Sequence, residues 1–176
     1  MGITAVGSGI QALDEVLQGL RPGDNVVWQV DSLEDYRYFT QPFADQAIAE
    51  GLDCVYLRFA PHPPVLSPRP GLTIIELDPS PGFDSFSREV HRIIEQRGRR
   101  VYYLFDNLSA LVVEWATDEL LANFFQVTCP FLYELETVTY FALTRGQHAN
   151  SAVARIRDTT QILIDVYHVQ EKMYIH

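Results

Sequence analysis

Short apolar runs alternate with amphipathic segments from Asp24 to Leu143, and this alternation limits the folds that the chain can adopt. Apolar runs without strict alternation are typical of strands that are covered on both faces. The segments between them place apolar residues three and four positions apart, which is typical of helices. The sequence therefore predicts βαβ units, which means an α/β fold with a mainly parallel central sheet, helices on both faces and right-handed crossovers.

The predicted strands and helices follow one another along the chain with turn residues between them. Strands are predicted over residues 24–30, 53–59, 72–77, 100–105 and 137–143. Helices are predicted over residues 10–17, 33–50, 83–96 and 111–135. A polar loop over residues 144–151 precedes a last hairpin, in which residues 159–169 and 172–175 turn at Gln170 and Glu171. This hairpin predicts an antiparallel edge to the sheet.

Two of the predicted helices contain a proline, which lacks the N–H that a helix interior needs. Pro42 lies within residues 33–50, so this helix either kinks there or begins only near Thr40. Pro130 lies within residues 111–135, and we expect that helix to be broken near Cys129 and Pro130.

Length and charge restrict the classes of protein to which the chain can belong. At 176 residues and 47% apolar, residues 1–176 are most simply one domain. The chain ends within a strand-like run, so a complete domain and the N-terminal part of a longer protein both remain possible. The formal net charge is −10, which argues against binding to nucleic acid or to an anionic membrane surface.

Cys54 and Cys129 each lie in an apolar run, so we expect two buried, reduced thiols rather than a disulfide. No signal-peptide pattern is visible, and no apolar run is long enough to span a bilayer. These features predict a soluble, cytoplasmic protein.

The stretch from Asn25 to Phe39 reads as a strand, a loop and the start of a helix. In α/β nucleotide-binding proteins such a corner holds phosphate groups. Here the corner has no glycine and no lysine, and it carries the three carboxylates Asp31, Glu34 and Asp35. The order of strand, loop and helix fits a phosphate site, but the residue types do not.

Three short motifs around this corner resemble the KaiC branch of the RecA-like ATPases. The runs from Ile10 to Asp14 and from Gly19 to Gly23 resemble the entry that precedes the phosphate loop of that branch. The run from Tyr102 to Ser109 is similar to its second nucleotide motif, in which apolar residues lead to an acid at a strand end. The resemblance implies a RecA-like three-layer fold and side-by-side assembly of copies.

A phosphate loop of the pattern GxxxxGK[ST] needs glycines, a lysine and a Ser or Thr ligand for Mg²⁺. Counted back from the helix end at Gly51, the lysine position falls on Tyr36 and the Ser/Thr position on Arg37. The two glycine positions fall on Val30 and Asp35. Acids beside a triphosphate would repel it, at a cost on the order of a few kcal/mol per contact in a partly desolvated pocket.

The strand after the first long helix departs from the family pattern as well. In the resembling proteins it ends in glutamates that polarise the attacking water, but here Ala60 and Pro61 follow Phe59. Neither side chain can act as a base. Asp106 remains at the Mg²⁺-binding position, where it can also serve as a capping residue for the turn after the strand. Alone it cannot support phosphoryl transfer.

Other polar groups each allow a functional and a structural interpretation. Arg145 lies where the resembling proteins place a sensor of phosphate or of a neighbouring subunit, and it can equally be a loop charge. With Gln147 and His148 it forms a candidate interface. The five arginines from Arg88 to Arg100 form either a solvated helix face or a basic patch that docks an acidic partner. Ser109 lacks a GxSxG context, and the five histidines show no metal-binding spacing.

These observations predict a catalytically inactive RecA/KaiC-like domain that acts as a regulatory, docking or oligomerisation module. We expect no cofactor, and we expect the partner to be a second copy or another protein. The alternative is a protein that still binds ATP and Mg²⁺, or hydrolyses ATP weakly, through a rearranged corner. The residues of that remnant nucleotide site are Asp31, Ser32, Tyr36, Arg37 and Asp106.

Overall fold

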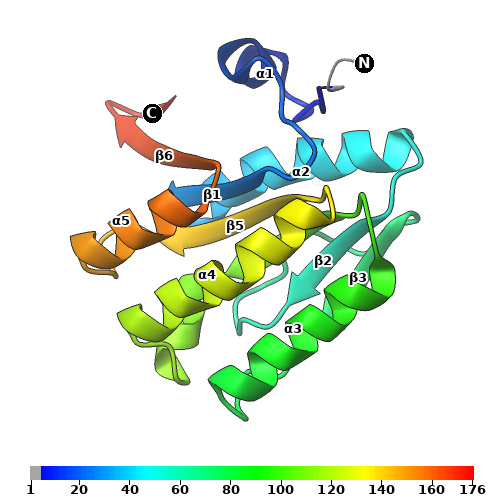
Figure 1. Cartoon of the computed structure of the whole chain (residues 1–176). Helices are drawn as coiled ribbons and strands as arrows, with labels where there is room; N and C mark the ends of the chain where they lie inside the picture. The colour runs from blue at the N-terminus through cyan, green and yellow to red at the C-terminus, as the bar shows by residue number, and fades with distance from the viewer. Residues whose placement is uncertain (1–4) are drawn as a thin grey trace.

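A seven-stranded sheet runs through the computed structural model of the chain, which describes residues 5–176 (Figure 1). The strand order is β3-β2-β4-β5-β1-β6-β7. The strands are β1 (Asn25–Val30), β2 (Cys54–Arg58), β3 (Leu72–Glu76), β4 (Tyr102–Asn107), β5 (Val138–Thr144), β6 (Ile162–Val169) and β7 (Lys172–Ile175). All neighbours are parallel except β6 and β7. The predicted α/β fold with a C-terminal antiparallel edge hairpin is confirmed, and the layout is consistent with a RecA-like one.

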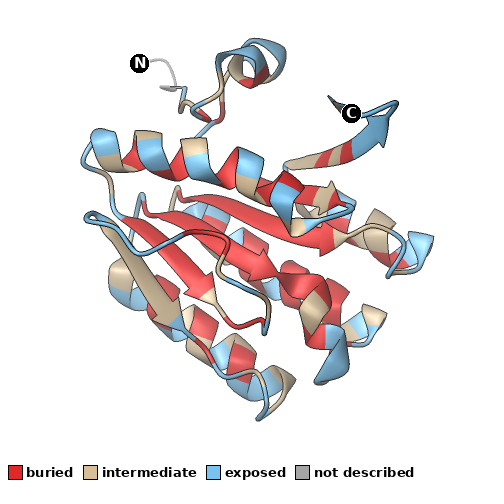
Figure 2. Cartoon of the chain, turned by 180° about the vertical axis from the view of Figure 1, so that it is seen from behind, coloured by how far each residue is buried: buried red, intermediate tan, exposed pale blue. Residues whose placement is uncertain are grey.

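Helices cover both faces of this sheet (Figure 1). The helices are α1 (Gln11–Leu17), α2 (Leu33–Ala49), α3 (Phe83–Arg97), α4 (Asp118–Glu134) and α5 (Asn150–Thr159), with a 3-10 helix, η1 (Leu108–Val113). Trp28 of β1 packs in a core with α1 and α2, whereas its neighbour Val27 packs in a second core with α3, α4 and α5. Figure 2 shows the central strands buried along their length. Burial on both faces explains why these strands are apolar without alternation.

Both proline-containing helices are continuous. The helix predicted over residues 33–50 begins at Leu33, so the alternative start near Thr40 is wrong, as is the expected break near Pro130. The carbonyls that lose their partners belong to Tyr38 and Gln126, four residues before each proline. Both residues are exposed, so water can satisfy these carbonyls. The opposite, buried face of each helix packs across the proline without interruption.

The region after β5 also differs from the prediction. Residues 150–159 form α5, whereas the sequence predicted a loop up to residue 151 and a strand from residue 159. Only Ala152 and Ile156 of α5 are buried, so the apolar periodicity that would reveal this helix is weak. The helix expected from residue 111 begins instead at Asp118, where the Thr117 hydroxyl accepts a hydrogen bond from the N–H of Leu120 at 3.2 Å.

Among the helices of residues 5–176, none combines the length and the apolar character that a membrane span requires.

Candidate functional site

The connection between β1 and α2 consists of two residues, Asp31 and Ser32. The Ser32 hydroxyl caps the helix by accepting a hydrogen bond from the N–H of Asp35 at 3.4 Å. The predicted phosphate-loop register, from Val30 to Arg37, is therefore wrong, because the residues from Leu33 onward are helical. The six loop residues of a GxxxxG phosphate loop cannot fit into a two-residue connection.

Tyr36 and Arg37 lie in the first turns of α2 and bind neighbouring segments of the chain. The buried Tyr36 hydroxyl donates to the carbonyl of Phe105 at 2.8 Å. Arg37 donates from Nε to the carbonyl of Val65 at 3.0 Å and from Nη2 to that of Pro64 at 2.9 Å. Arg37 thereby fastens the loop between β2 and β3 to α2.

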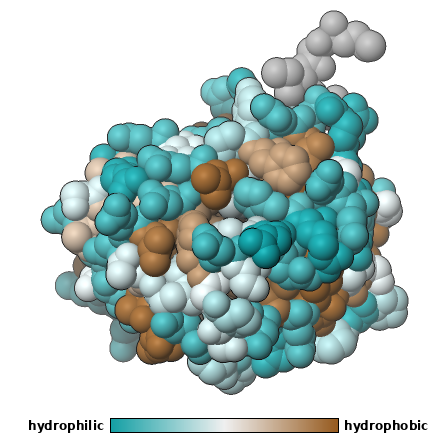
Figure 3. All heavy atoms as spheres, turned by 60° about the horizontal axis from the view of Figure 1, so that its bottom comes forward, coloured by the Kyte–Doolittle hydropathy of each residue, from teal (hydrophilic) through white to brown (hydrophobic). Residues whose placement is uncertain are grey.

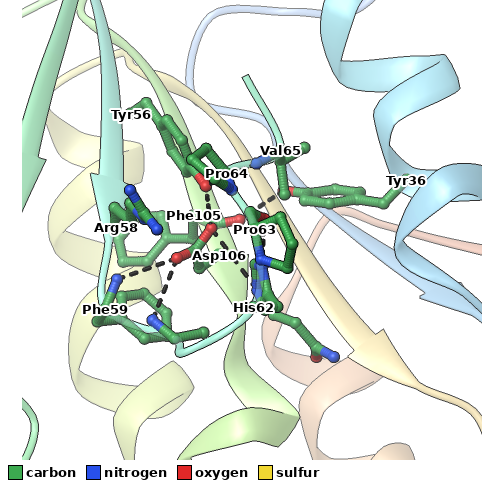
Figure 4. A network of polar contacts seen from close by, with 12 residues as sticks. Tyr36, Tyr56, Arg58, Phe59, His62, Pro63, Pro64, Val65, Phe105 and Asp106 are labelled. Carbon is green, nitrogen blue, oxygen red and sulfur yellow. Dashed lines mark hydrogen bonds and ion pairs between the residues drawn. The ribbon is translucent and has the colours of Figure 1, made fainter. Parts of the chain in front are cut away.

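Asp106 holds the same loop from the side of β4 (Figure 4). Its carboxylate is fully buried. Its Oδ1 accepts a hydrogen bond from the Tyr56 hydroxyl. Its Oδ2 accepts from the N–H groups of Phe59 at 3.0 Å and Ala60 at 3.1 Å. His62 Nε2 lies 3.8 Å from Oδ1. Burial raises the pKa of Asp106, while the Tyr56 and backbone hydrogen bonds oppose that rise.

The Tyr56 hydroxyl connects this network to the far end of the loop. It accepts a hydrogen bond from the N–H of Val65 at 3.0 Å while it donates to Asp106. Val65 and its neighbour Leu66 are buried in the core on the α2 side of the sheet. Residues 59–66 thus form a strap over the carboxyl ends of β2 and β4, which we call the β2–β3 strap. A phosphate or Mg²⁺ ion could reach Asp106 only if this strap moved away.

The structure separates the predicted nucleotide residues into two groups. Arg37 and Asp106 bind the β2–β3 strap, and Tyr36 binds Phe105 of β4, the residue before Asp106. Asp31 lies instead beside Arg145, whose Nε donates to it at 2.9 Å. Arg145 also binds Asp165 and the carbonyl of Val166. Arg145, at the end of β5, therefore links the β1–α2 corner to β6. Its guanidinium is already bound by these groups of the same chain.

His148 lies in a hydrogen-bonded series that the sequence did not predict. Its Nε2 lies 2.6 Å from the Ser109 hydroxyl oxygen, and its Nδ1 lies 2.9 Å from Oδ1 of Asp118. The N–H of Ala149 donates to the other Asp118 oxygen at 2.9 Å. These bonds, first that from Ala149 and then that from His148, lower the pKa of Asp118. The order Ser, His, Asp matches the hydrogen-bond pattern of an acyl-transfer triad.

Accessibility argues against catalysis by this series. Ser109 is only 3% exposed, and its hydroxyl oxygen accepts the N–H of Thr144 at 2.9 Å. A carbonyl substrate must come within about 3 Å of the nucleophile, and the surrounding chain occupies that space. The Ser109–His148–Asp118 series therefore joins η1, α4 and the loop before α5.

Gln147, the third residue of the predicted interface, is exposed.

The only sequence signal for this series is indirect. Ser109 and His148 each lie within a few residues of the end of a strand, β4 and β5, and these strands are parallel neighbours. Their carboxyl ends share one edge of the sheet, where functional groups commonly gather. Asp118 comes from a third segment, and no spacing in the sequence links it to the other two. Among residues 5–176, no cluster of three or more His, Cys, Asp or Glu side chains could hold a metal ion.

The fold and the corner together describe an α/β protein, consistent with a RecA-like layout, in which β1 leads into α2 through a two-residue connection capped by Ser32, and the β2–β3 strap covers Asp106. The sequence matches no protein-family model, and comparison with curated proteins finds no significant match. The resemblance to the KaiC branch therefore remains a prediction from the motifs quoted above.

Proposed function

We propose that this chain is a non-hydrolysing RecA/KaiC-like domain that serves as a docking or oligomerisation module with a regulatory role. The observation that carries this proposal is the engagement of Asp106, the one acid left from the nucleotide motifs, by Tyr56, Phe59 and Ala60. Opening the β2–β3 strap for Mg²⁺-ATP would break these bonds before any ligand contact formed. Leaving buried donors unpaired costs about 1–3 kcal/mol each.

The negative charges at the β1–α2 corner also disfavour the binding of a nucleotide. Glu34 and Asp35 lie in the first turn of α2, and Asp31 precedes it. A helix N-terminus that already carries carboxylates is a poor site for a phosphate group. We therefore disfavour the alternative in which Arg37 and Asp106 bind a nucleotide, since both side chains are occupied by the β2–β3 strap.

The edge hairpin provides the surface on which we base the docking role. Tyr167 and Tyr174 stack with ring centroids 5.7 Å apart, and both rings are exposed, as are Val169 and Ile175. The outer edge of β7 pairs with no other strand within residues 5–176. An unpaired edge beside exposed aromatic rings is suited to strand addition by a partner. The face shown in Figure 3, by contrast, carries only separate hydrophobic patches among hydrophilic residues.

We propose a second copy of the chain as the partner. Two β7 edges related by a two-fold axis would pair with each other, and each would bury the same tyrosines. We also place the protein in the cytoplasm, where Cys54 and Cys129, both buried and unpaired, would stay reduced.

Sedimentation equilibrium over a range of concentrations tests the docking role. We expect a reversible dimer that Tyr174→Asp weakens at least tenfold. Tyr38→Asp, at a comparably exposed tyrosine on α2, is the matched control and should leave the dimer intact. A wild-type monomer at every concentration, or equal effects of the two substitutions, would refute association through β7.

Thermal unfolding with Mg²⁺-ATP tests the loss of nucleotide binding. A ligand at 100 times its Kd stabilises a protein by about 2.7 kcal/mol. For a chain of this size, that corresponds to a shift of several degrees. We expect no shift at millimolar Mg²⁺-ATP. A clear shift that Asp106→Asn abolishes, while leaving the variant folded, would contradict the proposal.

A further inference from the structure

A large cavity lies at the opposite end of the sheet from the β2–β3 strap. It has a volume of about 880 Å³ and is bounded by the segments that precede β1, β2, β4 and β5, together with the ends of α2 and α4. A volume of this size falls within the usual range for small-molecule sites. No part of the closed corner contributes to it.

The charged groups of this cavity leave an excess of negative charge. Its lining contains three carboxylates, Glu50, Glu134 and Glu136, and one guanidinium, Arg100. Glu136 is neutralised, since Arg99 lies 2.9 Å and Arg100 3.4 Å from its oxygens. Within residues 5–176, Glu50 accepts a side-chain hydrogen bond only from the neutral Gln46 amide at 3.1 Å. The Glu134 side chain has no ion pair or hydrogen bond with any residue of the described chain.

Tyr102 supplies a second, independent observation. Tyr102 is only 7% exposed, and its ring stacks on Phe43 with centroids 5.4 Å apart. The residue lines the cavity, yet its hydroxyl has no hydrogen-bond partner among residues 5–176. Burial, with a contribution from Glu50, raises the pKa of Tyr102 to about 12, so the hydroxyl stays protonated at neutral pH. The Tyr102 ring is buried, whereas its hydroxyl opens into the cavity, where it is available to a polar group.

Tyr133 adds an aromatic face to the lining. It lies at the end of α4, and more than half of the residue is exposed. A cation over the face of an aromatic ring gains about 0.5–2 kcal/mol. Two unneutralised carboxylates, an accepting hydroxyl oxygen and an open ring together favour a positively charged N–H donor.

We propose that this cavity binds a small organic cation through its guanidinium or alkylammonium group. The cationic group lies between Glu50 and Glu134, donates to the Tyr102 hydroxyl oxygen, and contacts the Tyr133 ring. The arginine side chain of a partner peptide presents the same chemistry. The proposal is independent of the docking role of the edge hairpin.

Titration with n-butylguanidinium, followed by calorimetry and by the NMR signals of the tyrosine rings, tests this site. The neutral isostere n-butylurea has nearly the same shape and is the matched probe. We expect saturable binding of n-butylguanidinium, at least tenfold tighter than that of n-butylurea, with shifts in the Tyr102 and Tyr133 signals. Equal binding of the two probes, or no binding of the cation at millimolar concentration, would overturn the proposal.

Three variants locate the binding. The double substitution Glu50→Gln/Glu134→Gln should weaken binding of the cation at least tenfold, and Tyr102→Phe should weaken it several-fold while keeping the ring stacked on Phe43. Glu95→Gln, at an exposed carboxylate of α3, is the control and should leave the affinity unchanged. Unchanged affinity in the double variant, with its melting temperature preserved, would place the binding elsewhere and refute the site.

A further titration, with peptides, distinguishes a free small cation from the arginine side chain of a partner. The peptide acetyl-Ala-Arg-Ala-amide is compared with its citrulline counterpart, in which the guanidinium becomes a neutral urea. If the arginine peptide binds more tightly than n-butylguanidinium, the site takes a partner's arginine. If it binds less tightly, the site takes a free small cation. Both results support the proposal, whereas equal affinity for the arginine and citrulline peptides contradicts it.

Discussion

At the carboxyl end of β4, the Asp106 carboxylate accepts three hydrogen bonds that hold the β2–β3 strap in place. Asp106→Ala would leave the Tyr56 hydroxyl and the N–H groups of Phe59 and Ala60 without their acceptor. Since each buried, unpaired donor costs about 1–3 kcal/mol, we expect a total loss of about 3–5 kcal/mol in the free energy of unfolding. Urea denaturation measures it.

Asp31→Ala is the control for this measurement, because Asp31 is an acid at the same edge of the sheet but is exposed. Its ion pair with Arg145 should contribute less than about 1 kcal/mol. Similar small losses in both variants would show that Asp106 does not anchor the strap.

The burial of Asp106 also predicts a pH dependence. Burial raises the pKa of Asp106 in the folded state, so the folded protein holds the proton more tightly than the unfolded chain does. This contribution to stability is fully present below the unfolded pKa of about 3.9 and is lost as the pH rises through the folded pKa. The stability of the wild type relative to Asp106→Asn should therefore fall from about pH 4 upward. Urea denaturation of both proteins across pH checks this, and an opposite trend would contradict it.

Single residues were only partly predictable. Asp106 could be placed at a strand end, because an apolar run leads directly into it. Its partners Tyr56 and Ala60 lie about 50 residues earlier, and only the pairing of β2 with β4 brings them close. The sequence also offered no reason to place His62 beside Asp106, since the loop that carries it has no periodic pattern.

Among the elements, the segment that leads into α1 packs closely against α2 at Gly9. Gly9 has a φ of +84°, and an added Cβ would come closer than 3.0 Å to the Pro42 carbonyl of α2. We expect Gly9→Ala to lower the free energy of unfolding by several kcal/mol. The positive φ is unfavourable for alanine, and the added Cβ would clash with the Pro42 carbonyl. Gly51→Ala is the matched control, with a φ of +73° and open space around it, and should cost only about 1 kcal/mol. Thermal unfolding compares them, and equal losses would mean that the close contact with α2 does not matter.

The series that joins η1, α4 and the loop before α5 leads to a chemical prediction. Because Ser109 is buried and its oxygen holds the Thr144 N–H, we expect no labelling by a fluorophosphonate probe. Ser109→Ala should instead destabilise the fold by about 1–3 kcal/mol, because the Thr144 N–H loses its acceptor. Covalent labelling that His148→Ala abolishes would show that the series is catalytic.

The errors at the level of elements share one physical origin. Proline and weak periodicity are local signals, whereas Phe43 in α2, Cys129 in α4 and Ile156 in α5 are held by packing against the sheet. The same packing fixes the start of α2 at Leu33, three residues before the predicted lysine position at Tyr36. A register counted from Gly51 assumes a six-residue loop, whereas the predicted strand over residues 24–30 and helix over residues 33–50 leave only two residues between them, as the structure has it.

The distribution of charge across the whole molecule disfavours nucleic acid as a partner. The net charge is −10, and acids occupy the first turns of α2, α3 and α4. Arg97, Arg99 and Arg100 lie at the other end, where they pair with Asp53 and Glu136. We therefore expect no binding to a labelled single-stranded oligonucleotide at physiological salt, measured by fluorescence anisotropy. Saturable binding under these conditions would overturn this prediction.

The fold class was predictable because the central strands β1, β2, β4 and β5 are apolar on both faces and the helices α2, α3 and α4 carry apolar stripes. The order of the strands was not, since β5 inserts between β1 and β4 through contacts between residues far apart in sequence. The cavity at the amino end of the sheet depends on the same long-range arrangement, because separate segments before four strands contribute to its lining.

The two-residue connection at Asp31 and Ser32 has a consequence for the evolutionary and engineering routes that are open to this chain. Point substitutions cannot build a phosphate loop here, because they leave the number of residues between Val30 and Leu33 unchanged. Taking the missing residues from α2 would unwind its first turn and pull Tyr36 and Arg37 away from the carbonyls that they bind. Phosphate binding through a loop of the GxxxxG pattern would require an insertion of about four residues at this corner. A random library made only of substitutions should therefore never produce such a loop, however many positions are varied.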